Sequence, residues 1–137
     1  ASDKAKFISA YTASGLTPDG SSTYFLAKHV GLLRAKELFL TNRTLSADEA
    51  KQWGFVTEVV AHDNLTTKAN EIAIQLASGP TKAYGGVKRM LLSSFSSPIE
   101  SQLDNETRHI VGTMDTHDGP HGLNAFLNKE RPRFTGS

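Results

Sequence analysis

The sequence predicts a mostly α-helical portion of a protein, with about six or seven helices and two short strands. Three observations predict this: apolar residues recur at helical spacing, glycine and proline separate those stretches, and only two stretches favour β structure. The 137 residues include 15 Lys and Arg, 14 Asp and Glu, and no cysteine. Disulfides are therefore excluded, and the net charge of +1 gives no reason to expect a nucleic acid or a membrane as partner. We expect a soluble, cytoplasmic protein.

The first elements alternate with dense runs of turn-forming residues. Phe7 and Ile8 predict a short strand whose pairing partners come from elsewhere. Turn formers fill residues 15–22. Two helices are predicted next, one that stops at Gly31 and a strongly apolar one that ends near Asn42.

A capping box predicts the start of the next helix. Ser46 is expected to accept a hydrogen bond from the backbone N–H of Glu49, whose side chain reaches back. This short helix ends at Trp53 and Gly54, because glycine tolerates a positive φ beyond a helix end. The β-branched residues of 55–60 predict the second strand. Since two isolated strands form no stable sheet in water, another segment or chain is expected to complete it.

Only helices are predicted beyond this point. Apolar spacing indicates a helix over 65–76, ended by Gly79-Pro80, and a further helix that Gly85-Gly86 interrupts. A second capping box, Ser97-Pro98-Ile99-Glu100, has its proline at the first helical position. A last helix closes at Arg131-Pro132.

Several short motifs occur in an order and spacing that is specific when taken together. They are Ala5-Lys6-Phe7, Gly15-Leu16-Thr17-Pro18-Asp19-Gly20, Val30-Gly31-Leu32-Leu33-Arg34-Ala35, Leu40-Thr41-Asn42-Arg43, Leu45-Ser46-Ala47-Asp48-Glu49-Ala50, Trp53-Gly54-Phe55-Val56 and Gly122-Leu123-Asn124-Ala125-Phe126-Leu127-Asn128-Lys129. This succession resembles the C-terminal half of the crotonase superfamily, the enoyl-CoA hydratase/isomerase enzymes.

The resemblance implies an α/β crotonase fold, a ClpP/crotonase-like spiral of ββα turns followed by helices that build trimers. Residues 1–62 would form the last turn of the spiral core, with the active-site loop and the helices after it. Residues 63–137 would form the C-terminal helical trimerisation region. The implied partners are two further copies in a homotrimer, or a dimer of trimers, and a missing N-terminal half of the same protein.

The resemblance also implies the substrate, an acyl-CoA thioester. Coenzyme A would enter as part of that substrate, with no covalently bound cofactor and no metal. Two backbone N–H groups of the family stabilise an enolate oxyanion, and both would precede the position where this sequence begins. Because loss of even one such donor costs about 10²–10³ in rate, this chain alone is expected to be inactive.

Asp19 is the candidate catalytic residue that the resemblance implies. It stands where isomerase-like and dehalogenase-like members carry an acidic residue, which moves a proton in the former and attacks an aromatic ring in the latter. Tyr11 aligns with a glutamate of the hydratases, and a phenol with a pKa of about 10 replaces a carboxylate poorly. Tyr11 and Leu16 are candidate substrate-binding residues. The alternatives are a turn or N-cap role for Asp19 and plain packing for Tyr11.

Phe126 and Lys129 are candidates for binding coenzyme A. They fall where family members place a phenylalanine and a lysine near the nucleotide, and an ammonium group suits a phosphate. The alternatives are a core phenylalanine and a solvated lysine. His117 and His121 have the spacing of two metal ligands, but no third ligand is evident, and Gly119-Pro120 instead indicates the first turn of a helix.

The sequence therefore favours an isomerase-like acyl-CoA enzyme that shifts a double bond or rearranges a ring-derived acyl group. Two alternatives stay open, an enoyl-CoA hydratase proper and a non-catalytic module that trimerises through its helices.

Overall fold

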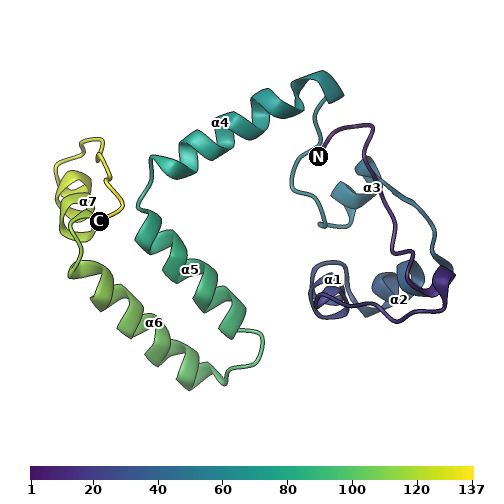
Figure 1. Ribbon diagram of the computed structural model, residues 1–137. Coiled ribbons are helices and arrows are strands. Elements are labelled where there is room, and N and C mark those ends of the chain that lie inside the picture. Colours follow the sequence, from purple (N-terminus) through teal and green to yellow (C-terminus); the bar gives the residue numbers. More distant parts are fainter. The chain divides into compact units, whose positions relative to one another are not determined.

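The computed structural model describes all residues 1–137, which divide into two compact units, Ala1–Ala69 and Asn70–Ser137. The boundary lies inside helix α4 (Leu65–Ala77). No helix combines the length and the apolar character that crossing a membrane requires. Seven α-helices account for most of the chain, as the apolar spacing predicts (Figure 1).

The first unit contains the two strands. Its elements, in chain order, are β1 (Lys6–Phe7), the 3₁₀ helix η1 (Thr12–Ser14), α1 (Ser22–Val30), α2 (Leu32–Thr41), β2 (Leu45–Ser46), α3 (Ala47–Gln52), the 3₁₀ helix η2 (His62–Asn64) and the start of α4. The second unit holds the rest of α4, then α5 (Thr81–Ser93), α6 (Ile99–Met114) and α7 (Asp118–Leu127). The predicted ends at Gly31 and Asn42 are confirmed.

The prediction for the strands is wrong in two respects. β1 pairs antiparallel with β2, Phe7 facing Leu45, so the first strand finds its partner within the chain. Residues 55–60 form no strand, because the N–H groups of Phe55 and Val56 donate to the carbonyl of Ala50 and close the end of α3. Only Val60 joins an isolated parallel bridge, to Ser2.

Trp53 joins the two parts of the core in the first unit. One cluster contains Val30, Ala35 and Phe39, the other contains Leu38, Leu45 and Ala50, and Trp53 packs against both. The guanidinium carbons of Arg34 and Arg43 lie 4.8 and 4.9 Å from the centre of the Trp53 ring. Such cation–π contacts add to the burial of the ring and hold it in place.

The capping box at the start of α3 is confirmed. The N–H of Glu49 donates to the hydroxyl of Ser46 at 3.3 Å. The pKa of Glu49 is lowered, first by the hydrogen bond from Arg43 and to a smaller extent by the backbone N–H of Ser46. Gly54 has the expected positive φ, at 75°.

Two predictions about the second unit are wrong. Pro98, in an extended conformation with ψ of 153°, is itself the N-cap of α6, and no side chain caps that helix. The helix starts at Ile99, so Ser97 stands one residue too early to cap it. In addition, α5 runs through Gly85-Gly86 without interruption, and Gly86 is buried beside His109 of α6.

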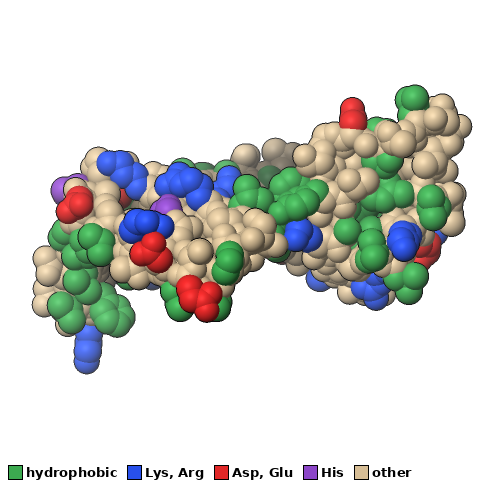
Figure 2. Space-filling model, turned by 90° about the horizontal axis from the view of Figure 1, so that it is seen from below, with side chains coloured by type: hydrophobic (Ala, Val, Ile, Leu, Met, Phe, Trp, Pro, Cys, Tyr) green, Lys and Arg blue, Asp and Glu red, His purple; other side chains and the backbone are tan.

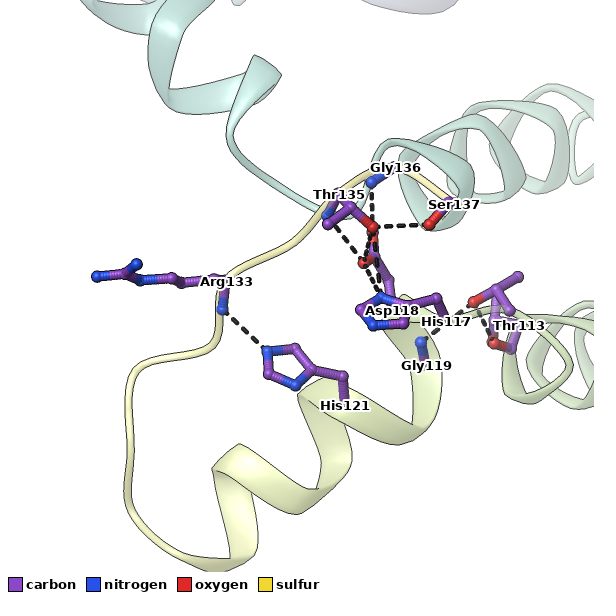
Figure 3. A network of polar contacts seen from close by, with 10 residues as sticks. Thr113, His117, Asp118, Gly119, His121, Arg133, Thr135, Gly136 and Ser137 are labelled. Carbon is purple, nitrogen blue, oxygen red and sulfur yellow. Dashed lines mark hydrogen bonds and ion pairs between the residues drawn. The ribbon is translucent and has the colours of Figure 1, made fainter.

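A buried carboxylate holds the last residues of the chain against the start of α7 (Figure 3). Asp118 is 4% exposed, and its two oxygens accept hydrogen bonds from the N–H groups of Thr135 at 2.9 Å and Gly136 at 2.7 Å. These bonds lower the pKa of Asp118 to about 2, although burial opposes them. The N–H of Arg133 donates to the Nε2 of His121 at 3.1 Å. The first turn of α7 begins at Asp118, so the expected helix turn is confirmed. His117 and His121 are not joined by a further His, Asp or Glu in a group that could hold a metal ion.

Candidate active site

Tyr11 and Asp19 meet in the loop region between β1 and α1. The hydroxyl of Tyr11 donates to Oδ1 of Asp19 at 2.8 Å. Tyr11 is half-buried and Asp19 is exposed. The hydrogen bond to Asp19, and then the charge of Asp19, raise the pKa of Tyr11. The phenol therefore stays neutral at physiological pH and acts as a donor to the carboxylate.

Two successive residues in the left-handed region turn the chain from Asp19 into α1. Gly20 has φ of 59° and Ser21 has φ of 61°. The carbonyl of Asp19 then accepts hydrogen bonds from the N–H of Ser22 at 3.0 Å and from its hydroxyl at 2.7 Å. The N-cap of α1 is Ser21, and no side chain caps this helix. The Asp19 carboxylate thus bonds to Tyr11 rather than to the helix end.

Asn42 fixes the segment that carries Tyr11. It ends α2 in the left-handed conformation, with φ of 53°, and its Oδ1 accepts from Thr12 Oγ1 at 3.0 Å and from the N–H of Ala13 at 3.3 Å. The same hydroxyl of Thr12 lies 2.6 Å from the carbonyl of Phe39. The sequence shows Asn42 only as a helix end, since its second role depends on a segment far away in the chain.

We expect Asn42→Gly to lower the free energy of unfolding by about 1 kcal/mol, because the N–H of Ala13 loses its acceptor. The hydroxyl of Thr12 loses one of two acceptors and keeps the nearer one, the carbonyl of Phe39. Glycine keeps the left-handed backbone, so the folded conformation of residue 42 is preserved in the variant. Urea denaturation measures the change, and faster amide exchange at Ala13 locates it. Asn42→Asp, which retains an acceptor oxygen, is the matched control. Equal losses in both variants would contradict the anchoring role.

The other candidate residues are placed as follows. Leu16 lies in the same loop as Asp19 and is 62% exposed, and its N–H donates to the carbonyl of Tyr11 at 3.0 Å. Phe126 and Lys129 belong to the second unit, at the end of α7, where Phe126 is 78% exposed. The structure thus brings Tyr11, Leu16 and Asp19 together in one loop.

Lys129 lies at a helix end that usually requires glycine. Its N–H donates to the carbonyl of Phe126 at 3.1 Å, and the N–H of Glu130 donates to the carbonyl of Ala125 at 2.8 Å. This is the Schellman pattern, whose left-handed residue is here Lys129, with φ of 57°. A lysine in this conformation carries backbone strain.

Comparison with known proteins decides the family. The model of the family described as enoyl-CoA hydratase/isomerase matches residues 1–137. The chain belongs to this family. A solved structure of an enoyl-CoA hydratase/isomerase from Cupriavidus metallidurans CH34 matches 98% of the chain and 51% of its own length, at 35% identity and a TM-score of 0.90. The crotonase fold expected from the sequence is confirmed.

Two curated relatives are named for different reactions of coenzyme A compounds. A 4-chlorobenzoyl coenzyme A dehalogenase of Arthrobacter sp is 37% identical over 93% of this chain and 46% of its own length. The 1,2-epoxyphenylacetyl-CoA isomerase of Escherichia coli K12 is 35% identical over 99% of this chain and 52% of its own length. The chain spans about half the length of the relatives it matches.

Proposed function

We propose that the protein to which this chain belongs is an acyl-CoA isomerase of the enoyl-CoA hydratase/isomerase family. The observation that carries the proposal is the exposed Asp19 carboxylate, which accepts from Tyr11 on Oδ1 and has no hydrogen bond from this chain on Oδ2. Tyr11 occupies the place that the resemblance assigns to a hydratase glutamate. A single carboxylate suits a reaction that moves a proton, whereas hydration in this family uses two glutamates.

The reaction needs no net change in atoms. The Asp19 carboxylate takes a proton from one carbon of the acyl group, and the electron pair moves toward the thioester oxygen, which becomes an enolate. The protonated Asp19 then returns the proton to another carbon, and the electron pair forms the shifted double bond. Backbone N–H groups that stabilise the oxyanion belong, in this proposal, to the half that the relatives possess beyond the matched region. The chain alone is then inactive.

Substrate contacts are proposed for the residues near the carboxylate and at the end of α7. Tyr11 and the exposed Leu16 line the acyl group in this proposal. Phe126 and Lys129 receive the nucleotide of coenzyme A, the first through its exposed ring and the second through its ammonium group.

We expect Lys129→Gly to raise the free energy of unfolding by about 1 kcal/mol, because glycine adopts the left-handed conformation without strain. The same variant is expected to bind acyl-CoA more weakly, since the ammonium group is lost. Urea denaturation and a thioester titration measure the two effects. Lys129→Asn, which also tolerates a positive φ, is the control. Undiminished affinity for the thioester in both variants would count against a phosphate contact.

The second unit supports assembly into the proposed homotrimer or dimer of trimers. Ala125 is the only hydrophobic residue buried in this unit, while Ile74, Ile110 and Leu127 are each more than 60% exposed. Figure 2 shows hydrophobic side chains at the surface around α7. Apolar surface on this scale marks a contact region. Copies of the same protein are the proposed cover.

A second candidate function is nucleophilic dehalogenation, which the 37% identity to the dehalogenases favours. Asp19 would attack the ring carbon that bears the halogen, halide would leave with its bonding electrons, and water would hydrolyse the resulting aryl ester. Asp19 is exposed, which such an attack requires.

Incubation of the intact protein with a panel of acyl-CoA thioesters in D₂O tests both candidates. Isomerisation yields a product with the elements of the substrate, carrying deuterium where protons were exchanged. Hydration yields a product that has gained water, and dehalogenation releases halide. A product that has gained water would overturn the isomerase assignment, and so would the absence of turnover with enoyl and ring-epoxide thioesters.

A further inference from the structure

We propose that Tyr11 is a positioning residue for Asp19, holding one carboxylate oxygen so that the other alone exchanges the proton with substrate. This inference rests on the proposed isomerase function. Its physical basis is the hydrogen bond from the Tyr11 hydroxyl to Oδ1 of Asp19, at 2.8 Å.

Both ends of this hydrogen bond are fixed by backbone contacts. The carbonyl of Tyr11 accepts from the N–H groups of Ser14 and Leu16, each at 3.0 Å, and Asn42 holds the residues that follow. The carbonyl of Asp19 accepts twice from Ser22. The phenol and the carboxylate therefore meet as two anchored groups, and the contact restricts rotation of the carboxylate.

The electrostatic surroundings favour a neutral donor at this position. No ion pair involves Asp19, so the phenol is its only side-chain partner. The raised pKa of Tyr11 keeps that partner protonated. A tyrosine thus orients the carboxylate without adding a charge, which leaves the oxygen Oδ2 able to accept a proton.

The chemical advantage is that one oxygen performs both proton transfers. In an isomerisation the oxygen that removes a proton must hold it and deliver it to a second carbon of the same substrate. A freely rotating carboxylic acid would turn this O–H toward water and lose the original proton to solvent. Holding Oδ1 keeps the O–H on Oδ2 directed at the substrate, so that part of the original hydrogen returns to it.

The experiment compares Tyr11→Phe with the unmodified intact protein, using a thioester labelled with deuterium at the carbon that loses its proton. We expect kcat to fall by about ten- to a hundredfold, with KM changed less than twofold, since misplaced reacting groups lose rate rather than ground-state binding. The fraction of deuterium retained in the product is also expected to fall. Tyr84→Phe, which removes a hydroxyl from the second unit, is the matched control and should change neither quantity.

An NMR measurement tests the hydrogen bond between Tyr11 and Asp19 independently of enzyme activity. The ring carbon signals of Tyr11, assigned by their loss in Tyr11→Phe, are followed by NMR as pH rises. We expect Asp19→Asn to lower the pKa of the Tyr11 phenol toward its ordinary value. An unchanged pKa would show that the hydrogen bond does not form and would overturn the proposal.

The two proposals fail in different ways. If Asp19→Asn abolishes turnover while Tyr11→Phe leaves kcat and deuterium retention unchanged, the positioning role is wrong and the isomerase function stands. If Asp19→Asn retains full activity, the proposed function itself is wrong.

Discussion

Replacement of Asp19 by asparagine is expected to lower kcat for acyl-CoA isomerisation by about 10²–10⁴-fold, the usual contribution of a general acid–base group. The amide has nearly the same size and can still accept from Tyr11, so the loop should keep its shape. It cannot take up and return a proton, however. The measurement is the initial rate at saturating thioester, together with thioester affinity, which we expect to stay within a few-fold.

The matched control for this prediction is Asp48→Asn, which neutralises an exposed aspartate in the first turn of α3. It removes one negative charge from the same unit without touching the loop. We expect its kcat to equal that of the unmodified protein. Equal losses in both variants would mean that net charge, and not proton transfer at Asp19, controls the rate.

Replacement of Asp118 by alanine is expected to have the largest effect on stability. It removes the acceptor of the bonds from Thr135 and Gly136 and leaves those N–H groups without protein partners. We expect the melting temperature to fall by about 5–10 °C. Hydrogen exchange should become faster at the amides of Thr135 and Gly136. Faster exchange there would show that residues 130–137 have separated from α7.

The exposed Asp115, at the end of α6, provides the control for this substitution. Asp115→Ala removes a carboxylate close by in sequence that accepts no hydrogen bond, and it should leave amide exchange at Thr135 unchanged. Asp118→Asn is a second informative variant. Its NH₂ group would face the N–H of Thr135 or of Gly136 and could not accept a hydrogen bond from it. If Asp118→Ala leaves the exchange rates unchanged, the carboxylate does not hold this segment.

Asp118 also predicts a pH dependence of stability. Its pKa in the folded protein is about 2, below the ordinary value of 3.8. A lowered pKa means that the folded state holds the charged form more strongly than the unfolded state does. The contribution is therefore complete above about pH 4 and is lost as pH falls toward 2. The melting temperature, measured at a series of pH values between about 5 and 2, should fall more steeply for the unmodified protein than for Asp118→Ala.

Much of the fold follows from local signals in the sequence. The ends of α1 and α2 were predictable because Gly31 and Asn42 adopt backbone conformations that few other residues tolerate. The start of α3 was predictable because Ser46 and Glu49 interact across one helical turn. Residues 55–60 misled the prediction because β-branched composition cannot reveal that their N–H groups are used to close a helix.

The candidate site was only partly predictable. The resemblance indicated Asp19 and Tyr11 separately, but no sequence signal showed that the phenol donates to the carboxylate, since loop closure brings them together. Asp118 was missed as well. The sequence indicated only that the first turn of a helix lies here, because the partners of Asp118 are at the far end of the chain, beyond the reach of any periodic pattern.

The contact of Trp53 with two arginines makes the first unit directly observable by fluorescence. It is the only tryptophan in the chain, and it touches both core clusters of that unit. The wavelength of its emission should shift when those clusters separate. Melting of α5, α6 and α7 should leave that wavelength unchanged. Emission and circular dichroism, recorded on one sample during heating, would then reveal whether the two units melt in one step or in succession.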